Sequence, residues 1–172
     1  MATWNTTVTN KGLALQAKQV SGAAISFTRV VSGAGIAQIV DLKNQTAVMD
    51  VKQKLSVEGI RIDGSKYIIS VLLSNNSVTT EYNLSQIGFY ATDPSEGEIL
   101  FAISQIDTPK PIPTSESAPG YSIEFSFTFQ NSNNAVIEIN PDMAGYVTRA
   151  EVANIVNEKI SDAIELGPDI EE

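Results

Sequence analysis

Three carboxylates stand close together in the segment TDPSEGE, which holds Asp93, Glu96 and Glu98. Calcium binds through several carboxylate oxygens, so one interpretation of this segment is a calcium site. The spacing fits no standard calcium loop, however, and an Asp-Pro pair is favoured in turns for backbone reasons alone. We therefore predict a solvated hairpin turn here and no metal site.

Asp93 and Glu98 are also the pair that a carboxylate hydrolase would use as general acid and base. The sequence has no histidine, which is the commonest general base and metal ligand, and no cysteine, which excludes thiolate chemistry and disulfides. It also places no aromatic sugar cleft around that turn. The lysines Lys66, Lys110 and Lys159 have no base or carbonyl pocket beside them, so we expect solvated side chains and no Schiff base. The chain is predicted not to be an enzyme and to use no cofactor.

Gly33 and Gly35 form a glycine-x-glycine pattern after an expected strand. A phosphate-binding loop would need a helix to open directly afterwards, because the helix amino terminus holds the phosphate. The following IAQIVDL is better interpreted as a strand or a short turn. The two glycines therefore predict a tight bend.

Aromatic side chains offer two candidate recognition surfaces. Phe125, Phe127 and Phe129 share one face of an alternating stretch, which fits a stacking platform but more often forms the inward face of a sheet. Trp4, the only tryptophan, is a candidate partner contact because tryptophan is enriched in interface hot spots. The alternative is that Trp4 packs the terminus onto the core.

The overall charge excludes one class of partner. The chain of 172 residues carries 20 acidic and 11 basic residues, a formal net charge of -9. Such a surface repels phosphate backbones, so we expect no nucleic-acid binding. No apolar run approaches the ~20 residues that a membrane span needs, and MATWNTTVTNKG lacks the order of a secretory signal. We expect no membrane insertion, and exit from a cell by lysis.

The elements that position these residues begin with a short helix. Thr9 or Asn10 can cap it, and Gly22 supplies a left-handed stop. Its apolar residues at helical spacing are Leu13, Ala14, Ala17 and Val20.

From Ile25 to Ile139 the pattern is mainly β, and we predict an antiparallel β-sandwich. Three hairpins are expected, turning at Asp63-Gly64, at TDPSEG and at NSNN, the last between Tyr121–Gln130 and AVIEIN. The apolar run KYIISVLLS predicts a strand buried on both faces, and the prolines of Thr108–Gly120 predict an irregular loop. The predicted core residues are Phe27, Leu55, Ile69, Val71, Leu100, Phe125, Phe127 and Ile137.

The carboxyl-terminal part has a helical pattern. Thr148 and Glu151 form a capping box, and the predicted helix runs to about Leu166, before Gly167 and Pro168. A narrow apolar stripe suits self-association, with three chains favoured by β-branched seam positions; its residues are Ala153, Val156, Ile160 and Ala163. Ile155 and Ile164 widen the face, so packing on its own β domain is the alternative. We predict a β-rich domain over 1–140 and a linker with this helix over 141–172.

Two stretches carry a resemblance to a known family. TNKGLALQAKQVSGAAISFTRVVSGAG and YNLSQIGFYATDPSEGEILFAISQ resemble the amino-terminal domain of phage tail-collar fibre proteins, over roughly residues 1–139. Gln86 stands where that family usually has an acidic residue, and Phe89 stands where it usually has leucine. The closing YVTRAEVANIV resembles the helix that leads such domains into a trimeric shaft.

The resemblance implies a structural role. It implies a virion component, assembled in the bacterial host cytoplasm, that attaches a tail fibre to the baseplate and forms a homotrimeric stem. Its implied partners are its own copies, baseplate proteins and a distal fibre or receptor-binding protein. The family is defined by a scaffold, so no catalytic residue is carried over. An alternative function for a β-sandwich is a carbohydrate-binding adhesin module.

Overall fold

The computed structural model describes residues 3–18, 25–130 and 137–139. The predicted boundary at residue 140 and the predicted helix over 148–166 therefore lie outside the described residues, as do Val20 and Gly22.

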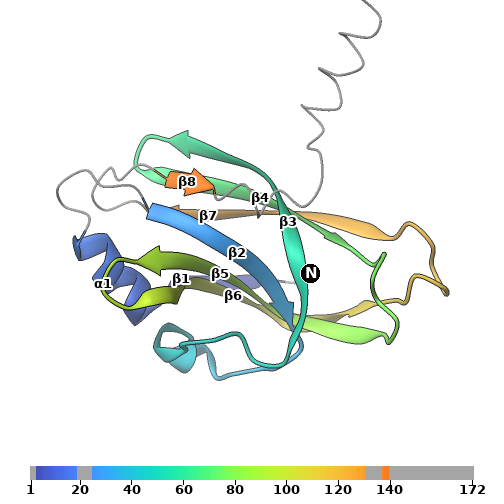
Figure 1. Cartoon of the computed structure of the whole chain (residues 1–172). Helices are drawn as coiled ribbons and strands as arrows, with labels where there is room; N and C mark the ends of the chain where they lie inside the picture. Colours follow the sequence, from blue (N-terminus) through green and yellow to red (C-terminus); the bar gives the residue numbers. More distant parts are fainter. Residues whose placement is uncertain (1–2, 19–24, 131–136, 140–172) are drawn as a thin grey trace, which may run out of the picture.

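The fold is mainly β, as the sequence predicts, with one short helix near the amino terminus (Figure 1). The hydrogen-bonded path of strands runs β1-β6-β5-β2-β3-β4-β7, and neighbours along it are antiparallel. In chain order the elements are β1 (Trp4–Val8), α1 (Asn10–Lys18), β2 (Ile25–Gly33), the 3-10 helix η1 (Ile39–Asn44), β3 (Val51–Asp63), β4 (Lys66–Ser74), β5 (Tyr82–Asp93), β6 (Gly97–Ile112), β7 (Ser122–Gln130) and β8 (Ile137–Ile139).

The strands form one continuous sheet that curls into a nearly closed barrel, where a sandwich would have two separate sheets. Strand β3 makes the difference because it belongs to both layers in Figure 1: residues 51–55 pair with β2, whereas residues 56–63 pair with β4. At the far end of the path, Trp4 of β1 meets the rings of Phe125 and Phe127 of β7, with centroids 5.4 and 5.5 Å apart. The two end strands thus meet through side chains.

Strand β8 corrects the third predicted hairpin. Strand β7 does alternate as expected, but it pairs with β4 across registers such as Ile69↔Phe127. The return segment pairs in parallel with the start of β2, as Ile25↔Ile137, and so does not form a hairpin with β7. It takes the place beside β2 that β3 leaves when it turns toward β4.

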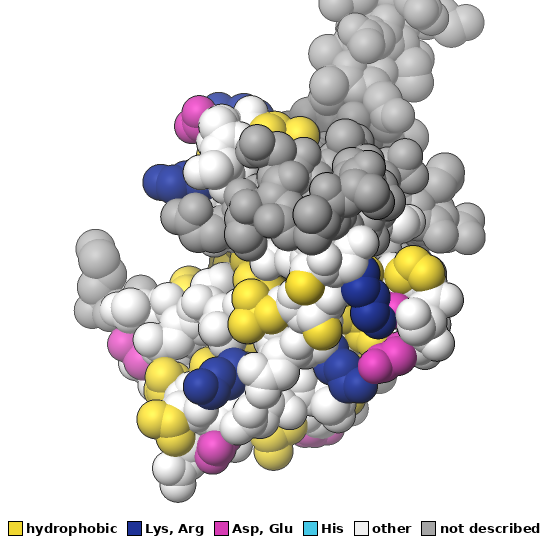
Figure 2. All heavy atoms as spheres, turned by 90° about the vertical axis from the view of Figure 1, so that its left-hand side faces the viewer, with side chains coloured by type: hydrophobic (Ala, Val, Ile, Leu, Met, Phe, Trp, Pro, Cys, Tyr) yellow, Lys and Arg dark blue, Asp and Glu magenta, His cyan; other side chains and the backbone are white. Residues whose placement is uncertain are grey.

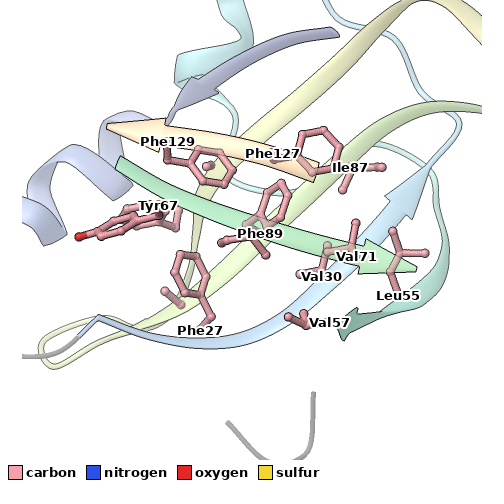
Figure 3. Packing of buried hydrophobic residues seen from close by; sticks show 14 of the residues in the cluster. Phe27, Val30, Leu55, Val57, Tyr67, Val71, Ile87, Phe89, Phe127 and Phe129 are labelled. Atoms are coloured by element: carbon pink, nitrogen blue, oxygen red, sulfur yellow. The ribbon is translucent and has the colours of Figure 1, made fainter. Parts of the chain in front are cut away.

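The main core lies inside the curled sheet, between β2, β5 and β6 on one side and β4 and β7 on the other. Figure 3 shows the phenylalanine rings of β2, β5 and β7 turned toward one another. Phe89 of β5 contacts Phe127 and Phe129 edge to face, at 5.2 and 4.9 Å between centroids. Such pairs stabilise the core beyond the apolar area that they bury. Of the predicted core residues, Phe27, Leu55, Ile69, Val71 and Phe127 are buried in this core, and Phe125 is partly buried against it. Leu100 is also buried, but in a second, smaller cluster. The side chain of Ile137 lies outside the described residues.

Strand β4 is buried on one face and not on both, which corrects the prediction from its apolar run. Tyr67, Ile69, Val71 and Leu73 are buried, whereas Ile68 and Leu72 on the opposite face are only half-buried. The run is continuous because residues on the outer face are also aliphatic, but no second layer covers that face within the described chain.

Helix α1 forms where predicted, and the hydroxyl of Thr9 caps it by accepting the amide of Gly12 at 3.0 Å. Its packing face differs from the predicted stripe. Gly12, Leu15 and Gln16 are buried, while Leu13 is 50 % exposed and Ala14 and Ala17 are exposed too. The cause is close packing on β6: a Cβ atom on Gly12 would lie 2.0 Å from the carbonyl oxygen of Phe101. Only glycine allows this approach. The contact determines which face of the helix packs on β6.

The first two predicted turns are confirmed, and the proline-rich loop is shorter than predicted. Gly64 has φ +58 in the β3–β4 turn, and Gly97 has φ +82 after the β5–β6 turn. Strand β6 continues through Pro109 and Pro111 to Ile112. β1 begins at Trp4, opposite Ile106, so the last residues of β6 have no β1 partner and form an edge, where a missing amide proton removes no ladder hydrogen bond.

Candidate functional site

The acidic turn between β5 and β6 is an ion-paired surface beside α1. Lys11 pairs with Glu96, Lys18 with Asp93, and Arg29 with Glu98, at nitrogen–oxygen distances of 2.5, 2.7 and 3.0 Å. Figure 2 views this end of the molecule, where dark-blue basic and magenta acidic side chains lie beside one another. Each carboxylate therefore has a basic partner of its own, and none of these pairs leaves two carboxylates facing a shared ion or substrate.

Asp93 is the buried member of this group. Its carboxylate accepts a hydrogen bond from the ammonium of Lys18 and another from the backbone amide of Ser95, both at 2.7 Å. The bond from Ser95 lies within the turn and stabilises it. The hydrogen bond from Lys18, followed by the amide of Ser95, lowers the pKa of Asp93 below its ordinary value. A general acid needs a raised pKa, so Asp93 is poorly suited to that role.

Glu98 is held differently. It accepts the hydroxyl of Thr28 at 2.6 Å and the guanidinium of Arg29 at 3.0 Å. The guanidinium of Arg29 also lies over the ring of Tyr90, 4.2 Å from its centroid. These contacts join β2, β5 and β6 at the surface. No group of three or more His, Cys, Asp or Glu side chains in the described chain is placed to hold a metal ion.

We predict that Asp93→Asn makes the protein less sensitive to acid. Because the pKa of Asp93 is lowered in the folded state, its contribution is present above the unfolded pKa of about 3.9 and is lost as pH falls through the folded value. The difference in unfolding free energy between wild type and variant should thus be largest near neutral pH and shrink below about pH 4. Urea unfolding at a series of pH values measures it.

Glu96→Gln serves as the control, because its ion pair with Lys11 is exposed on both sides. Calcium titration of the same proteins by calorimetry gives an independent check. Saturable calcium binding that Asp93→Asn abolishes would contradict the ion-paired turn and restore the metal-site interpretation.

Gly33 and Gly35 allow two chain segments to approach closely. A Cβ on Gly33 would lie 2.4 Å from the carbonyl oxygen of Met49, and one on Gly35 would lie 2.3 Å from Cβ of Met49. The amides of Ala34 and Gly35 donate to the carbonyls of Asp50 and Met49 at 3.0 and 3.1 Å. The close approach at the glycines and these two hydrogen bonds hold the two ends of the segment 34–50 together. IAQIVDL, predicted as a strand or a short turn, runs into the 3-10 helix η1, which begins at Ile39.

This segment, which we call the cover segment (residues 34–50), lies on the outer face of the sheet. Leu42 and Val48 pack with Val31, Leu100 and Ile103 in a second, smaller core. The hydroxyl of Tyr90 accepts the amide of Val48 at 3.0 Å. The cover segment is thus part of the folded domain, because it makes apolar contacts with the sheet and is hydrogen-bonded to it.

Three glutamines fix the cover segment. Gln86 of β5 is fully buried; its amide nitrogen donates to Gln105 at 2.8 Å and to Gln45 at 3.0 Å, and its oxygen accepts the amide of Met49 at 3.1 Å. Gln105 in turn accepts from and donates to the backbone of Ala37, at 2.9 and 2.8 Å. A carboxylate in place of Gln86 would lose both donated bonds. Gln86 thus fits its surroundings where the resembling family usually has an acid.

The cover segment presents aliphatic side chains to solvent at a groove beside β1. Ile39 is 50 % and Val40 is 73 % exposed. The groove has a volume of about 520 Å³ and is lined by Trp4, Asn5, Thr6, Thr7, Ile39, Val40, Leu42 and Lys43. Apolar side chains held outward on a fixed segment are typical of protein-interaction surfaces. This groove is the candidate functional site.

Trp4 packs onto the core, which is one of its two predicted roles, and it also lines the groove; its role as a partner contact stays a prediction. Its ring packs edge to face on Phe125 and Phe127, and it remains half-buried where it lines the groove. The face of Phe125, Phe127 and Phe129 points into the core, so it is not a platform for sugars or bases. Lys66 and Lys110 are exposed, and Lys159 lies outside the described residues.

The predicted oligomerisation residues Ala153, Val156, Ile160 and Ala163 also lie outside the described residues. The described helices are too short or too polar to cross a membrane. No family model, no curated protein and no solved structure matches this chain. The groove could not be predicted from the sequence, because β1 and the cover segment, which line it, are separated along the chain. The glutamines that fix the cover segment also look like ordinary surface residues.

Proposed function

We propose that this chain is a structural module of a phage tail or phage-tail-like particle, which attaches a tail fibre to the baseplate, and that it is not an enzyme. The observation that carries the proposal is the groove of β1 and the cover segment. There, Ile39 and Val40 are exposed on a segment that buried glutamines hold in place. Such a pre-ordered apolar surface binds a protein partner with little loss of conformational entropy.

The groove supports binding to a protein partner, and the resemblance to tail-collar fibre proteins is the basis for proposing a phage tail as the particle. Its first stretch covers α1 and β2, and its second covers the β5–β6 hairpin, which are joined by the ion pairs of Lys18 with Asp93 and Arg29 with Glu98. The two stretches therefore lie next to each other in the domain. The phenylalanine face does not support the carbohydrate-binding alternative, because it points inward.

Labelling in the intact particle tests the proposal. Antibody-labelled gold against this chain should mark the junction of baseplate and fibre in electron micrographs of particles from the producing cells. Particles that carry no label, or label along the sheath or head, would contradict the attachment role. Release of the chain from particles together with the fibre would support it.

The proposal includes a stem of three chains formed through residues 148–166. A helix of this length is marginal alone in water, so it must pack on something, and β-branched residues at seam positions favour three strands or more. We predict that the sedimentation mass of the full chain falls to one third when the chain ends at Gly145. The double variant Val156→Asp with Ile160→Asp should do the same. An unchanged mass would favour docking of the helix on its own domain.

A further inference from the structure

The groove of β1 and the cover segment lies on the outer face of the sheet. Thr7 stands opposite Ile103 in the β1–β6 ladder, and Ile103 belongs to the small core under the cover segment. Residues two apart on a strand share a face, so Asn5 points outward with Thr7. Strand β7 meets β1 on the inner side, through the ring of Trp4. A molecule in the groove therefore lies across side chains of β1 and needs no strand edge.

The cover segment supplies the apolar part of the groove. Ile39 and Val40 are exposed, whereas Leu42 between them and Lys43 is buried in the small core and holds η1 on the sheet. Burial of the two exposed side chains against an aliphatic partner residue removes their surface from water, which favours binding. The volume of about 520 Å³ is that of a ligand-sized pocket, so it holds a short peptide segment and not the face of a whole domain.

The charge in the groove is positive. Lys43 is the charged residue among those that line it, and it forms no ion pair within the described chain. Asp41 precedes it on η1 but does not line the groove, although Ile39, Val40 and Leu42 do. In a chain with a formal net charge of -9, this is a local exception. An unpaired ammonium beside an apolar surface attracts a carboxylate, because a charged donor and a charged acceptor form the stronger hydrogen bonds.

Asn5 offers a hydrogen-bonding pair on the opposite side of the groove. Its side chain is half-buried and makes no hydrogen bond to another described residue. A carboxamide can donate and accept at the same time. These two groups match the carbonyl and the amide of one peptide unit, which is the repeating polar element of any protein segment.

We propose that the groove binds a short acidic segment of the partner protein, in which an aliphatic residue is followed by an aspartate or a glutamate. The aliphatic side chain covers Ile39 and Val40, the carboxylate pairs with Lys43, and the main chain of the segment bonds to Asn5. The inference rests on the proposed function in one respect, since it takes the partner to be a baseplate protein.

The first experiment titrates the full-length chain with the peptide GSEIVEGS, blocked at both ends. Trp4 lines the groove and is the only tryptophan, so its fluorescence reports binding at this place. We expect a saturable change with a dissociation constant below about 1 mM. The peptides GSKIVKGS and GSEAAEGS should bind at least tenfold more weakly, because the first repels Lys43 and the second covers little aliphatic surface. No saturable change with GSEIVEGS, or equal binding of the three peptides, would overturn the proposal.

A pair of charge reversals locates the carboxylate. Lys43→Glu and Lys66→Glu change the net charge equally, and both side chains are exposed, but only Lys43 lines the groove. We expect Lys43→Glu to weaken binding of GSEIVEGS at least tenfold and to bind GSKIVKGS more tightly than the wild type does. Lys66→Glu should stay within twofold of the wild type for both peptides. Equal effects of the two variants would assign the charge preference to the whole surface and overturn the contact with Lys43.

A second pair of variants tests the aliphatic contact. Val40 and Ile62 are 73 % and 54 % exposed, so truncation of either leaves the core intact, and only Val40 lines the groove. Val40→Ser should weaken binding of GSEIVEGS at least fivefold, whereas Ile62→Ser should leave it unchanged. An unchanged affinity of Val40→Ser would remove the cover segment from the binding site and contradict the proposal.

The chain's own residues 168–172, PDIEE, have the same chemistry and are the rival occupant. A version that ends at Gly167 should bind GSEIVEGS within twofold of the full-length chain. Binding at least tenfold tighter would show that the chain's own tail fills the groove, and would overturn its assignment to a partner.

Failure of this inference is distinguishable from failure of the proposed function. Peptide binding by the isolated chain does not depend on where the chain sits in a particle, and gold labelling does not depend on the groove. Label at the junction of baseplate and fibre without peptide binding rejects the groove as the binding site. Peptide binding with label elsewhere supports the groove and rejects the attachment role.

Discussion

Replacing Phe127 with alanine should lower the free energy of unfolding by roughly 3–5 kcal/mol, the usual cost of emptying a buried phenylalanine site. Phe127 is 4 % exposed and contacts Trp4 and Phe89 edge to face. It therefore links the two end strands of the curled sheet to its centre. Urea unfolding followed by the fluorescence of Trp4, the only tryptophan, measures the change.

The matched control is Thr128→Ala, one residue further along β7. Thr128 is exposed on the outer face of the same strand, so its truncation should change the stability by no more than about 0.5 kcal/mol. A small effect at Phe127 together with a large one at Thr128 would mean that β7 faces the other way, because a shift of one residue reverses the faces of a strand.

The inward face of β7 could be predicted from the sequence because it depends on local alternation alone. Phe125, Phe127 and Phe129 recur every second residue, and the structure places them on the core side. The outer face of β4 could not be predicted in this way. Ile68 and Leu72 look like core residues, and only the arrangement of the other strands shows that no layer covers them.

Strand pairings between distant segments could not be predicted from the sequence for a related reason. Residues 137–139 follow β7 closely, so a hairpin is the natural expectation, yet they pair with β2, which lies more than a hundred residues earlier. Neighbours in sequence have the shorter loop to close. The space that β3 vacates beside β2 is a property of the whole sheet, and no local pattern records it.

The candidate site shows the same limit. The acidic turn was predicted as a turn, but its basic partners Lys11, Lys18 and Arg29 come from α1 and β2. The glutamines that hold the cover segment are 41 and 19 positions apart along the chain. Glutamine is mostly exposed in proteins, so its type alone does not suggest a buried network. Trp4 was singled out by type, and its groove became visible only with η1 in place.

Asn75 carries the second large effect that we expect. Asn75 follows β4 and is fully buried, and its side-chain nitrogen donates to the carbonyls of Pro113, Thr114 and Ala118 at 3.1, 2.9 and 2.9 Å. Its own amide donates to the carbonyl of Tyr121 at 3.1 Å. This one residue therefore anchors the loop between β6 and β7. Its side-chain oxygen has no hydrogen-bond partner in the described structure, so the donors make its contribution.

We predict that Asn75→Asp lowers the unfolding free energy by at least about 3 kcal/mol at pH 7, since an ionised carboxylate at this buried position donates nothing and faces three carbonyl acceptors. Those carbonyls should raise the pKa of the new carboxyl in the folded state. The variant should then be least impaired below its unfolded pKa of about 3.9 and lose stability as pH rises through the folded value. The exposed neighbour supplies the control, because Asn76→Asp has the same chemistry without burial. Equal unfolding curves for the two variants across this pH range would show that Asn75 does not hold the loop.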